Sequence, residues 1–171
     1  MILLLQYTLI FASVLILVAL GGCFAEHSGV INLGLEGIMI MGALGGALTM
    51  RYVPNTAPAI VMLLAVIVVS ALVGMVYSCL LAVASINFKA DQTLVGTALN
   101  LLGTAGATVI VKAINTAANP DDVSSAIQYA TPKTAFIVNI GKFEFNWFML
   151  IAFIAIIFAW VTLYKTRFGL R

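Results

Sequence analysis

A carboxylate stands inside one of the most apolar stretches of the chain. Glu36 lies seven positions into the run 30–50, and Asn32 would lie one turn before it on the same face of a continuous helix. A charged group at the centre of a lone membrane helix costs about 2.5–3.5 kcal/mol, so Glu36 is expected to face a bundle interior or a watery path. In the alternative interpretation, the helix begins late and Glu36 caps its start near the interface. Three glycines would permit such a break: Gly29, Gly34 and Gly37.

A second polar pattern follows in the run 93–111. Its polar residues are spaced by 4, 3, 4 and 4 positions, which confines them to an arc of roughly 80° on a helix: Thr93, Thr97, Asn100, Thr104 and Thr108. Gly96 and Gly103 lie beside this stripe. The stripe would line a translocation path, or it would be a packing face where helices approach closely and threonine hydroxyls bond to helix carbonyls. Packing is the commoner role for Thr and Gly in membranes, whereas the Asn100 amide needs a partner or water.

The other reactive residue types exclude several functional classes. His27 is the only histidine and has no second ligand at metal spacing, so neither a metal nor another cofactor is expected. No G-x-x-x-x-G-K-[ST] run and no supported catalytic set is present, so the chain is predicted to be neither an enzyme nor a nucleotide hydrolase. A net charge of +2, with no basic cluster before the last seven residues, argues against a nucleic-acid partner.

The elements that must position these residues are membrane helices. Hydrophobic residues make up 63% of the 171-residue chain and charged residues 8%, whereas soluble domains have about 45–50% and 25%. Lipid requires every backbone polar group to be paired within its segment, which forces helices. Five runs approach the roughly 20 residues needed to cross the bilayer core: 2–25, 30–50, 57–86, 93–111 and 146–164. The predicted fold is an all-α polytopic transmembrane bundle of about five spans, the second of them broken.

The predicted organisation is a single transmembrane domain, 1–171, with a long extracytoplasmic loop at 112–145. Cytoplasmic flanks of membrane helices are rich in Lys and Arg, and the tightest basic cluster is Lys165, Arg167 and Arg171. This cluster places the C-terminus in the cytoplasm and, with five spans, the N-terminus outside. The full count of basic residues is four on each side, so the orientation rests on the cluster alone.

Three blocks of the sequence, in order, resemble one protein family. The stretch 19–39 contains Glu-His-Ser-Gly-Val-Ile-Asn-Leu-Gly-Leu-Glu-Gly, 90–102 reads Ala-Asp-Gln-Thr-Leu-Val-Gly-Thr-Ala-Leu-Asn-Leu-Leu, and 164–171 reads Tyr-Lys-Thr-Arg-Phe-Gly-Leu-Arg. Together they resemble the bacterial ABC-importer inner-membrane permeases of the ribose, branched-chain amino-acid and nucleoside family. The likeness is best to the nucleoside and simple-sugar branch, although Ala25-Glu26-His27 stands where Ser-Glu-Arg is usual.

The resemblance implies a multi-pass permease subunit of the bacterial cytoplasmic membrane that moves a small polar solute, such as a nucleoside or simple sugar, by alternating access. Its implied partners are ABC ATPase subunits, an extracytoplasmic substrate-binding protein and a second permease subunit, identical or different. In the family, Phe-Gly-Leu-Arg precedes a coupling helix that docks on the ATPase and then further spans, so the chain resembles the N-terminal part of a longer permease.

The residues expected along the pathway are Asn32, Glu36, Thr97 and Asn100. Three alternatives remain open for the function. One is a branched-chain amino-acid permease of the same family. Another is a membrane assembly subunit that transports nothing, in which polar residues only join helices. The third is a secondary transporter or channel that works without ATP.

Overall fold

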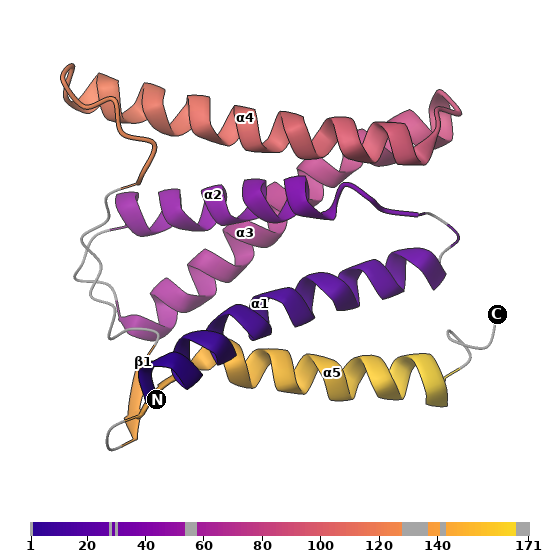
Figure 1. Cartoon of the computed structure of the whole chain (residues 1–171), viewed down its shortest axis with the longest axis horizontal. Helices are drawn as coiled ribbons and strands as arrows, with labels where there is room; N and C mark the ends of the chain where they lie inside the picture. The colour runs from indigo at the N-terminus through magenta and orange to yellow at the C-terminus, as the bar shows by residue number, and fades with distance from the viewer. Residues whose placement is uncertain are drawn as a thin grey trace. The chain divides into compact units, whose positions relative to one another are not determined.

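Helices account for most of the chain. The computed structural model describes residues 2–27, 29, 31–53, 58–127, 137–140 and 143–166. The long helices are α1 (Ile2–His27), α2 (Leu35–Tyr52), α3 (Ala59–Ala82), α4 (Gln92–Ala118) and α5 (Trp147–Lys165) (Figure 1). A π-helical turn, η1 (Val83–Asn87), continues α3, and the strands β1 (Ile137–Ile140) and β2 (Phe143–Asn146) form an antiparallel hairpin. The predicted all-α membrane bundle is confirmed, and the hairpin is a small addition to it.

Among the described residues, four helices are long and apolar enough to cross a membrane: α1, α3 with η1, α4 and α5. The remaining helix, α2, has 18 residues and is about 27 Å long at 1.5 Å per residue. Within the predicted run 30–50, α2 begins only at Leu35, after a non-helical segment, Asn32–Gly34, so the late start that the alternative interpretation expected is the one observed. The predicted break therefore lies before α2, and the helix itself is continuous.

The first residues of the predicted loop 112–145 are helical in the structure. Helix α4 continues to Ala118, because a helix that satisfies its own backbone groups does not need to stop where the apolar run ends. The far end of the predicted loop contains the β1–β2 hairpin, in which Ile137 pairs with Asn146.

The chain divides into two compact units, and the first consists of Met1–Ile31 and Phe136–Arg171. In this unit α1 packs against α5, and β2 packs on α1. Ala152 and Ala159, two turns apart on α5, are both 2% exposed, as expected of small residues at helix contacts in membranes. Ser13 of α1 is buried too, and its hydroxyl donates to the carbonyl of Ile10 at 2.7 Å.

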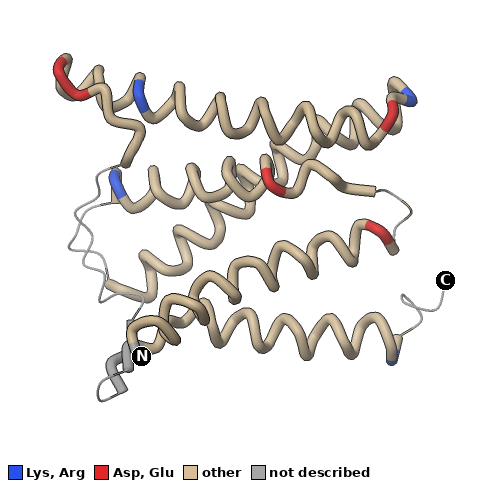
Figure 2. Tube along the Cα trace, in the orientation of Figure 1, with Lys and Arg blue, Asp and Glu red and all other residues tan. Residues whose placement is uncertain are grey.

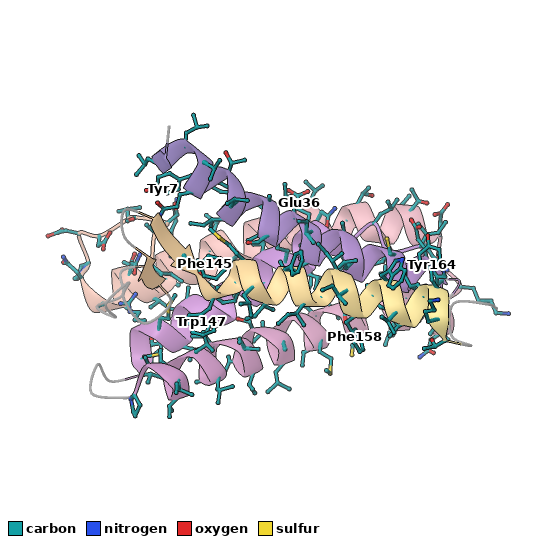
Figure 3. The ribbon with its side chains drawn as sticks, turned by 90° about the horizontal axis from the view of Figure 1, so that it is seen from below. Tyr7, Glu36, Phe145, Trp147, Phe158 and Tyr164 are labelled. Carbon is teal, nitrogen blue, oxygen red and sulfur yellow. The ribbon has the colours of Figure 1, made fainter. Side chains whose placement is uncertain are left out.

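Aromatic side chains lie at both ends of α5. Figure 3 shows Phe145 and Trp147 at its start and Tyr164 at its end. The Lys165 Nζ lies 5.9 Å from the centroid of the Trp160 ring. Aromatic and basic residues at helix ends anchor a span at the two headgroup levels, so α5 has the pattern of a membrane-crossing helix.

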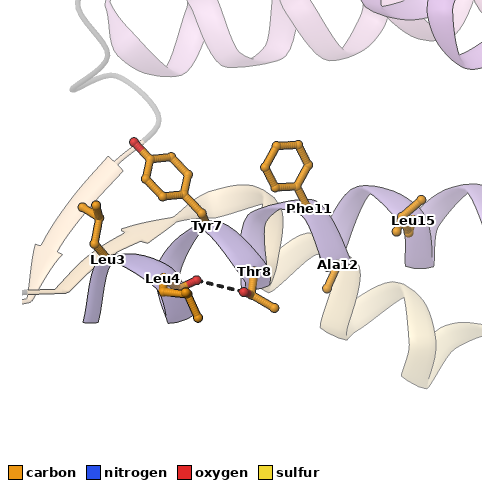
Figure 4. A pocket seen from close by; sticks show the side chains of 7 residues that line it. All are labelled: Leu3, Leu4, Tyr7, Thr8, Phe11, Ala12 and Leu15. Atoms are coloured by element: carbon orange, nitrogen blue, oxygen red, sulfur yellow. Dashed lines mark hydrogen bonds between the residues drawn. The ribbon is translucent and has the colours of Figure 1, made fainter. Parts of the chain in front are cut away.

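One face of α1 is an apolar surface with a shallow hollow (Figure 4). The hollow is lined by Leu3, Leu4, Tyr7, Thr8, Phe11, Ala12 and Leu15. The Thr8 hydroxyl in it donates to the Leu4 carbonyl at 2.8 Å, so this polar group is already paired within the helix. A surface of this kind suits contact with hydrocarbon.

The second unit, Asn32–Ala135, is built on α2, which packs against both α3 and α4 (Figure 1). One buried cluster joins Leu44 of α2 to Ala107 and Val111 of α4. Another joins Tyr77 of α3 to Leu99 of α4, and the Tyr77 hydroxyl donates to the Leu99 carbonyl at 2.6 Å. The three helices therefore share one continuous set of contacts that fixes α2 between its neighbours.

Glycines set how closely the helices of this unit approach. A methyl group added at Gly37 of α2 would lie 2.6 Å from a carbonyl oxygen of α4, and one added at Gly103 would lie 2.8 Å from the Gly37 Cα. Toward α3, methyl groups at Gly42 and Gly46 would lie 3.3 and 2.5 Å from atoms of Ser70. Gly42 and Gly46, four residues apart, thus form a small-residue contact of α2 with α3.

Charged residues of the second unit gather mainly at the ends of its helices (Figure 2). Asp91 precedes α4 and caps it, accepting hydrogen bonds from the backbone N–H groups of Thr93 at 2.8 Å and Leu94 at 3.4 Å. These two donors favour the ionised carboxylate and hold the pKa of Asp91 below its usual value. The cap is therefore present at neutral pH, and its stabilisation is lost only in acid, as the pH falls through that lowered pKa.

Gly103→Ala is expected to lower the free energy of unfolding by about 1–3 kcal/mol, because the new methyl group would collide with the α2 backbone. Gly106→Ala is the matched control on the same helix, since an added methyl there has no atom within 4 Å. It is expected to be neutral or to stabilise the helix by up to about 1 kcal/mol. Thermal unfolding of the purified protein in detergent measures both, and equal effects would contradict the close approach of α2 and α4.

Candidate functional site at the start of α2

The chain reaches α2 through the short non-helical segment Asn32–Gly34, whose backbone groups need partners outside a helix. The Asn32 Oδ1 accepts a hydrogen bond from the Gly34 N–H at 3.0 Å. This local turn competes with helix formation, so helical structure begins only after it. The expectation that Asn32 shares a helical face with Glu36 is therefore wrong.

Asn100 of α4 supplies further partners for the start of α2. Its Nδ2 donates to the Leu33 carbonyl at 2.8 Å, and its Oδ1 accepts from the Gly37 N–H at 2.8 Å. The first N–H groups of a helix have no partner within it. The Asn100 amide of α4 thus caps the start of the neighbouring helix α2. The hydrogen-bond partner that this amide was expected to need is the backbone of α2 and of the residue before it, Leu33.

This bridge requires the two backbones to be almost in contact. Gly96 and Gly103 lie one turn before and one turn after Asn100 on α4. A methyl group added at Gly96 would lie 2.9 Å from the Leu33 Cβ and 3.0 Å from the Gly34 nitrogen. The packing interpretation of these two glycines therefore holds, because any side chain there would push α2 away from the Asn100 amide.

Glu36 and Thr97 have exposed side chains at this site. Glu36 lies in the first turn of α2, where the positive end of the helix dipole favours a carboxylate. The Thr97 hydroxyl donates to carbonyl oxygens of its own helix at 2.9 and 3.1 Å. The hydroxyls of Thr104 and Thr108 donate in the same way, at 2.9 and 2.8 Å. These threonines therefore offer acceptor oxygens rather than free donors.

The start of α2 lies part-way along α4, which is long and apolar enough to span a membrane. Helix α4 has 27 residues and is about 40 Å long, so a bilayer core of about 30 Å centred on it begins about 5 Å from its first residue. The bond from Gly37 to Asn100 places Gly37 eight residues along α4, which is about 12 Å. Glu36 then lies about 5 Å inside the hydrocarbon edge, between the interface and the midplane.

A groove of about 370 Å³ runs between α2 and α4. It is lined by Ile40, Ala43, Leu44, Ala47, Thr104, Ala107, Thr108, Val111, Ser125 and Ile127. Glu36 lies one turn before Ile40 on α2, and Asn100 lies one turn before Thr104 on α4. The polar stripe predicted from the sequence therefore continues along one wall of the groove, which combines apolar side chains with hydroxyl oxygens.

Two residues that the sequence analysis did not select lie at the far end of α2. The Arg51 Nη1 donates to the Asn115 Oδ1 at 2.7 Å, and Asn115 is only 3% exposed. The sequence contains a signal for Asn115, because this residue continues the three- and four-residue spacing of the buried face of α4 past residue 111, where the predicted span ends. That face consists of Gly96, Leu99, Gly103, Ala107, Val111 and Asn115. Bonds at both ends of α2 join residues 63 and 64 apart, so α2 and α4 run parallel.

The family assignment follows from the sequence over almost its whole length. Residues 4–171 match the family described as the branched-chain amino acid transport system / permease component. The chain belongs to this family. No solved structure matches the chain.

The similar proteins are permeases about twice as long. The chain is 40% identical over 169 residues to the guanosine ABC transporter permease protein NupQ of Bacillus subtilis (strain 168). It is 34% identical over 166 residues to the nucleoside ABC transporter permease protein NupC of Lactococcus lactis subsp. cremoris (strain MG1363). These alignments cover 96% and 95% of the chain but 52% of each relative, so the chain spans about half the length of the curated relatives it matches.

A putative glucose ABC transporter permease protein, TsgC13 of Haloferax volcanii, is 37% identical over 105 residues, which is 59% of the chain and 29% of that protein. The resemblance to the ABC-importer permeases, with its nucleoside and sugar branch, is thereby confirmed. The relatives are named as permeases rather than enzymes, as predicted. The family and the four apolar helices also confirm a multi-pass protein of the inner membrane.

Asn100→Ala is expected to lower the free energy of unfolding by about 1–3 kcal/mol, because the Leu33 carbonyl and the Gly37 N–H lose their partner. Hydrogen–deuterium exchange of the peptide that contains Leu35–Gly37 should become faster at the same time. Thr97→Val is the control, since the lost hydroxyl bonds only to its own helix, and it should change stability by less than about 0.5 kcal/mol. Unchanged exchange in Asn100→Ala would show that the amide does not hold α2.

Proposed function

We propose that this chain forms part of the membrane-spanning permease of an ATP-driven importer, which moves a nucleoside or simple sugar by alternating access. The family supports a permease, and the names of the relatives support the solute class. The observation that carries the proposal is the start of α2 part-way along α4, beside the hydroxyl-lined groove. A solute with hydroxyl groups and an apolar ring face would match this combination of polar and apolar surface.

The four pathway residues have two different roles in this proposal. Asn32 and Asn100 hold the lead-in to α2, since their amides are bonded to its backbone. Glu36 and Thr97 are exposed, so they present a carboxylate and a hydroxyl oxygen to the passing solute. Sugar hydroxyls are hydrogen-bond donors, and both of these groups accept hydrogen bonds.

Three partners complete the proposed importer in the bacterial cytoplasmic membrane. ABC ATPase subunits would hydrolyse ATP, because the chain has no phosphate-binding loop of its own. A substrate-binding protein would deliver the solute on the outer side. A second permease subunit, identical or different, would form the other wall of the path.

Two other functions predict different results. A branched-chain amino-acid permease, which the family description allows, would take up labelled leucine rather than guanosine or glucose. An assembly subunit that transports nothing would purify without ABC ATPase subunits, whereas a permease should bring them down. Uptake assays with the three labelled solutes, together with co-purification, separate these possibilities.

Glu36→Gln is expected to reduce uptake about tenfold or more at an unchanged level of protein in the membrane, because a neutral amide is a weaker acceptor than a carboxylate. Asp121→Asn, the same change at an exposed residue after α4, is the control and should leave uptake unchanged. Normal uptake by Glu36→Gln would mean that Glu36 only caps α2, and its place in the pathway would have to be abandoned.

A further inference from the structure

The segment that follows α4, Asn119–Ile127, folds back over the groove between α2 and α4. Ser125 and Ile127 form part of the groove wall. Ile127 also packs on the buried cluster that joins Leu44 to Ala107 and Val111. We call Asn119–Ile127 the strap, since it covers the groove near the end where Arg51 meets Asn115.

One buried side chain holds the strap. The Asn115 Nδ2 donates to the carbonyls of Ser124 at 3.0 Å and Ala126 at 2.9 Å. Its Oδ1 accepts from Arg51 at 2.7 Å, so the two atoms of the amide serve different elements. A longer bond of 3.3 Å, from the Thr116 hydroxyl to the Asp122 carbonyl, adds less to the attachment.

We propose that Asn115 is a positioning residue that holds the strap over the α2–α4 groove, and that the strap must detach before a solute can pass this end of the groove. The role of the groove as a solute path rests on the proposed function, whereas the attachment of the strap does not. Because the strap uses the Asn115 nitrogen and α2 uses its oxygen, the strap can detach while Arg51 continues to tie α2 to α4.

Asn115→Asp separates these two attachments. The aspartate keeps an oxygen for Arg51 but has no donor for the carbonyls of the strap. A reporter cysteine at Ala107, which lines the groove, is 9% exposed and belongs to the cluster on which Ile127 packs, measures the opening of the groove in a chain whose Cys23 and Cys79 are replaced by serine. In unsealed membranes, where the orientation of the chain does not matter, the rate of reaction with a polar maleimide should rise on the order of tenfold, because the strap loses the two neutral hydrogen bonds from the Asn115 amide nitrogen.

Asn119→Asp is the matched control, because the same chemical change falls on an exposed residue whose side-chain oxygen accepts within the strap. It should leave the rate unchanged. An unchanged rate in Asn115→Asp, or an equal rise in both variants, would overturn the role of Asn115. This arm needs no transport, so a failure to carry solute would count against the proposed function alone.

A second arm keeps Asn115 intact and pins the strap. Cysteines at Ser125 and Ala47, which both line the groove, are joined with a short cleavable crosslinker in the assembled transporter. Uptake should stop on crosslinking and return when the linker is cut. Continued uptake with the strap pinned would show that solute passes without its release and would overturn the gating role.

Discussion

The structure of the second unit depends on one constraint: backbone groups away from water must have partners. Helix α2 starts part-way along α4, and its first N–H groups and the carbonyl of Leu33 before it need partners from outside the helix. The Asn100 amide satisfies one of each, at 2.8 Å in both cases. It reaches them only because Gly37, Gly96 and Gly103 let the two backbones touch. The position of Glu36 and the shape of the groove both follow from this contact.

A second asparagine of α4, Asn115, binds the opposite end of α2 through Arg51. Asn115 accepts from Arg51 and donates to the strap, as Asn100 accepts from Gly37 and donates to Leu33. Each amide therefore uses both its oxygen and its nitrogen, and each ties α2 to α4. Between these two ends, Leu44 packs against Ala107 and Val111, and the groove lies over this cluster.

Much of this arrangement was accessible from the sequence. Hydropathy located the membrane helices, and residue spacing identified Gly96 and Gly103 as packing residues. The position of Asn100 in an apolar run indicated that its amide needs a hydrogen-bond partner. A late start of α2 was one of two interpretations that the sequence left open. Hydropathy could not choose between them or locate the end of α4 at Ala118, because it reports preference for lipid and not hydrogen bonds between residues 63 or 64 positions apart. Asn115 was overlooked because the predicted span ended at residue 111, although the spacing of the buried face of α4 continues to Asn115. The pathway roles of Asn32, Glu36, Thr97 and Asn100 remain predictions, since geometry alone does not reveal a moving solute.

The central claim is that α2 crosses the membrane parallel to α4, held at both ends by asparagines of that helix. Single cysteines at Tyr52, Lys89 and Asn119, in a background without Cys23 and Cys79, test it with an impermeant thiol reagent applied to intact cells and to inside-out vesicles. The account predicts that Tyr52 and Asn119 react from the outside and Lys89 from the cytoplasm. Labelling of Tyr52 from the same side as Lys89 would mean that α2 does not cross, and would contradict the account.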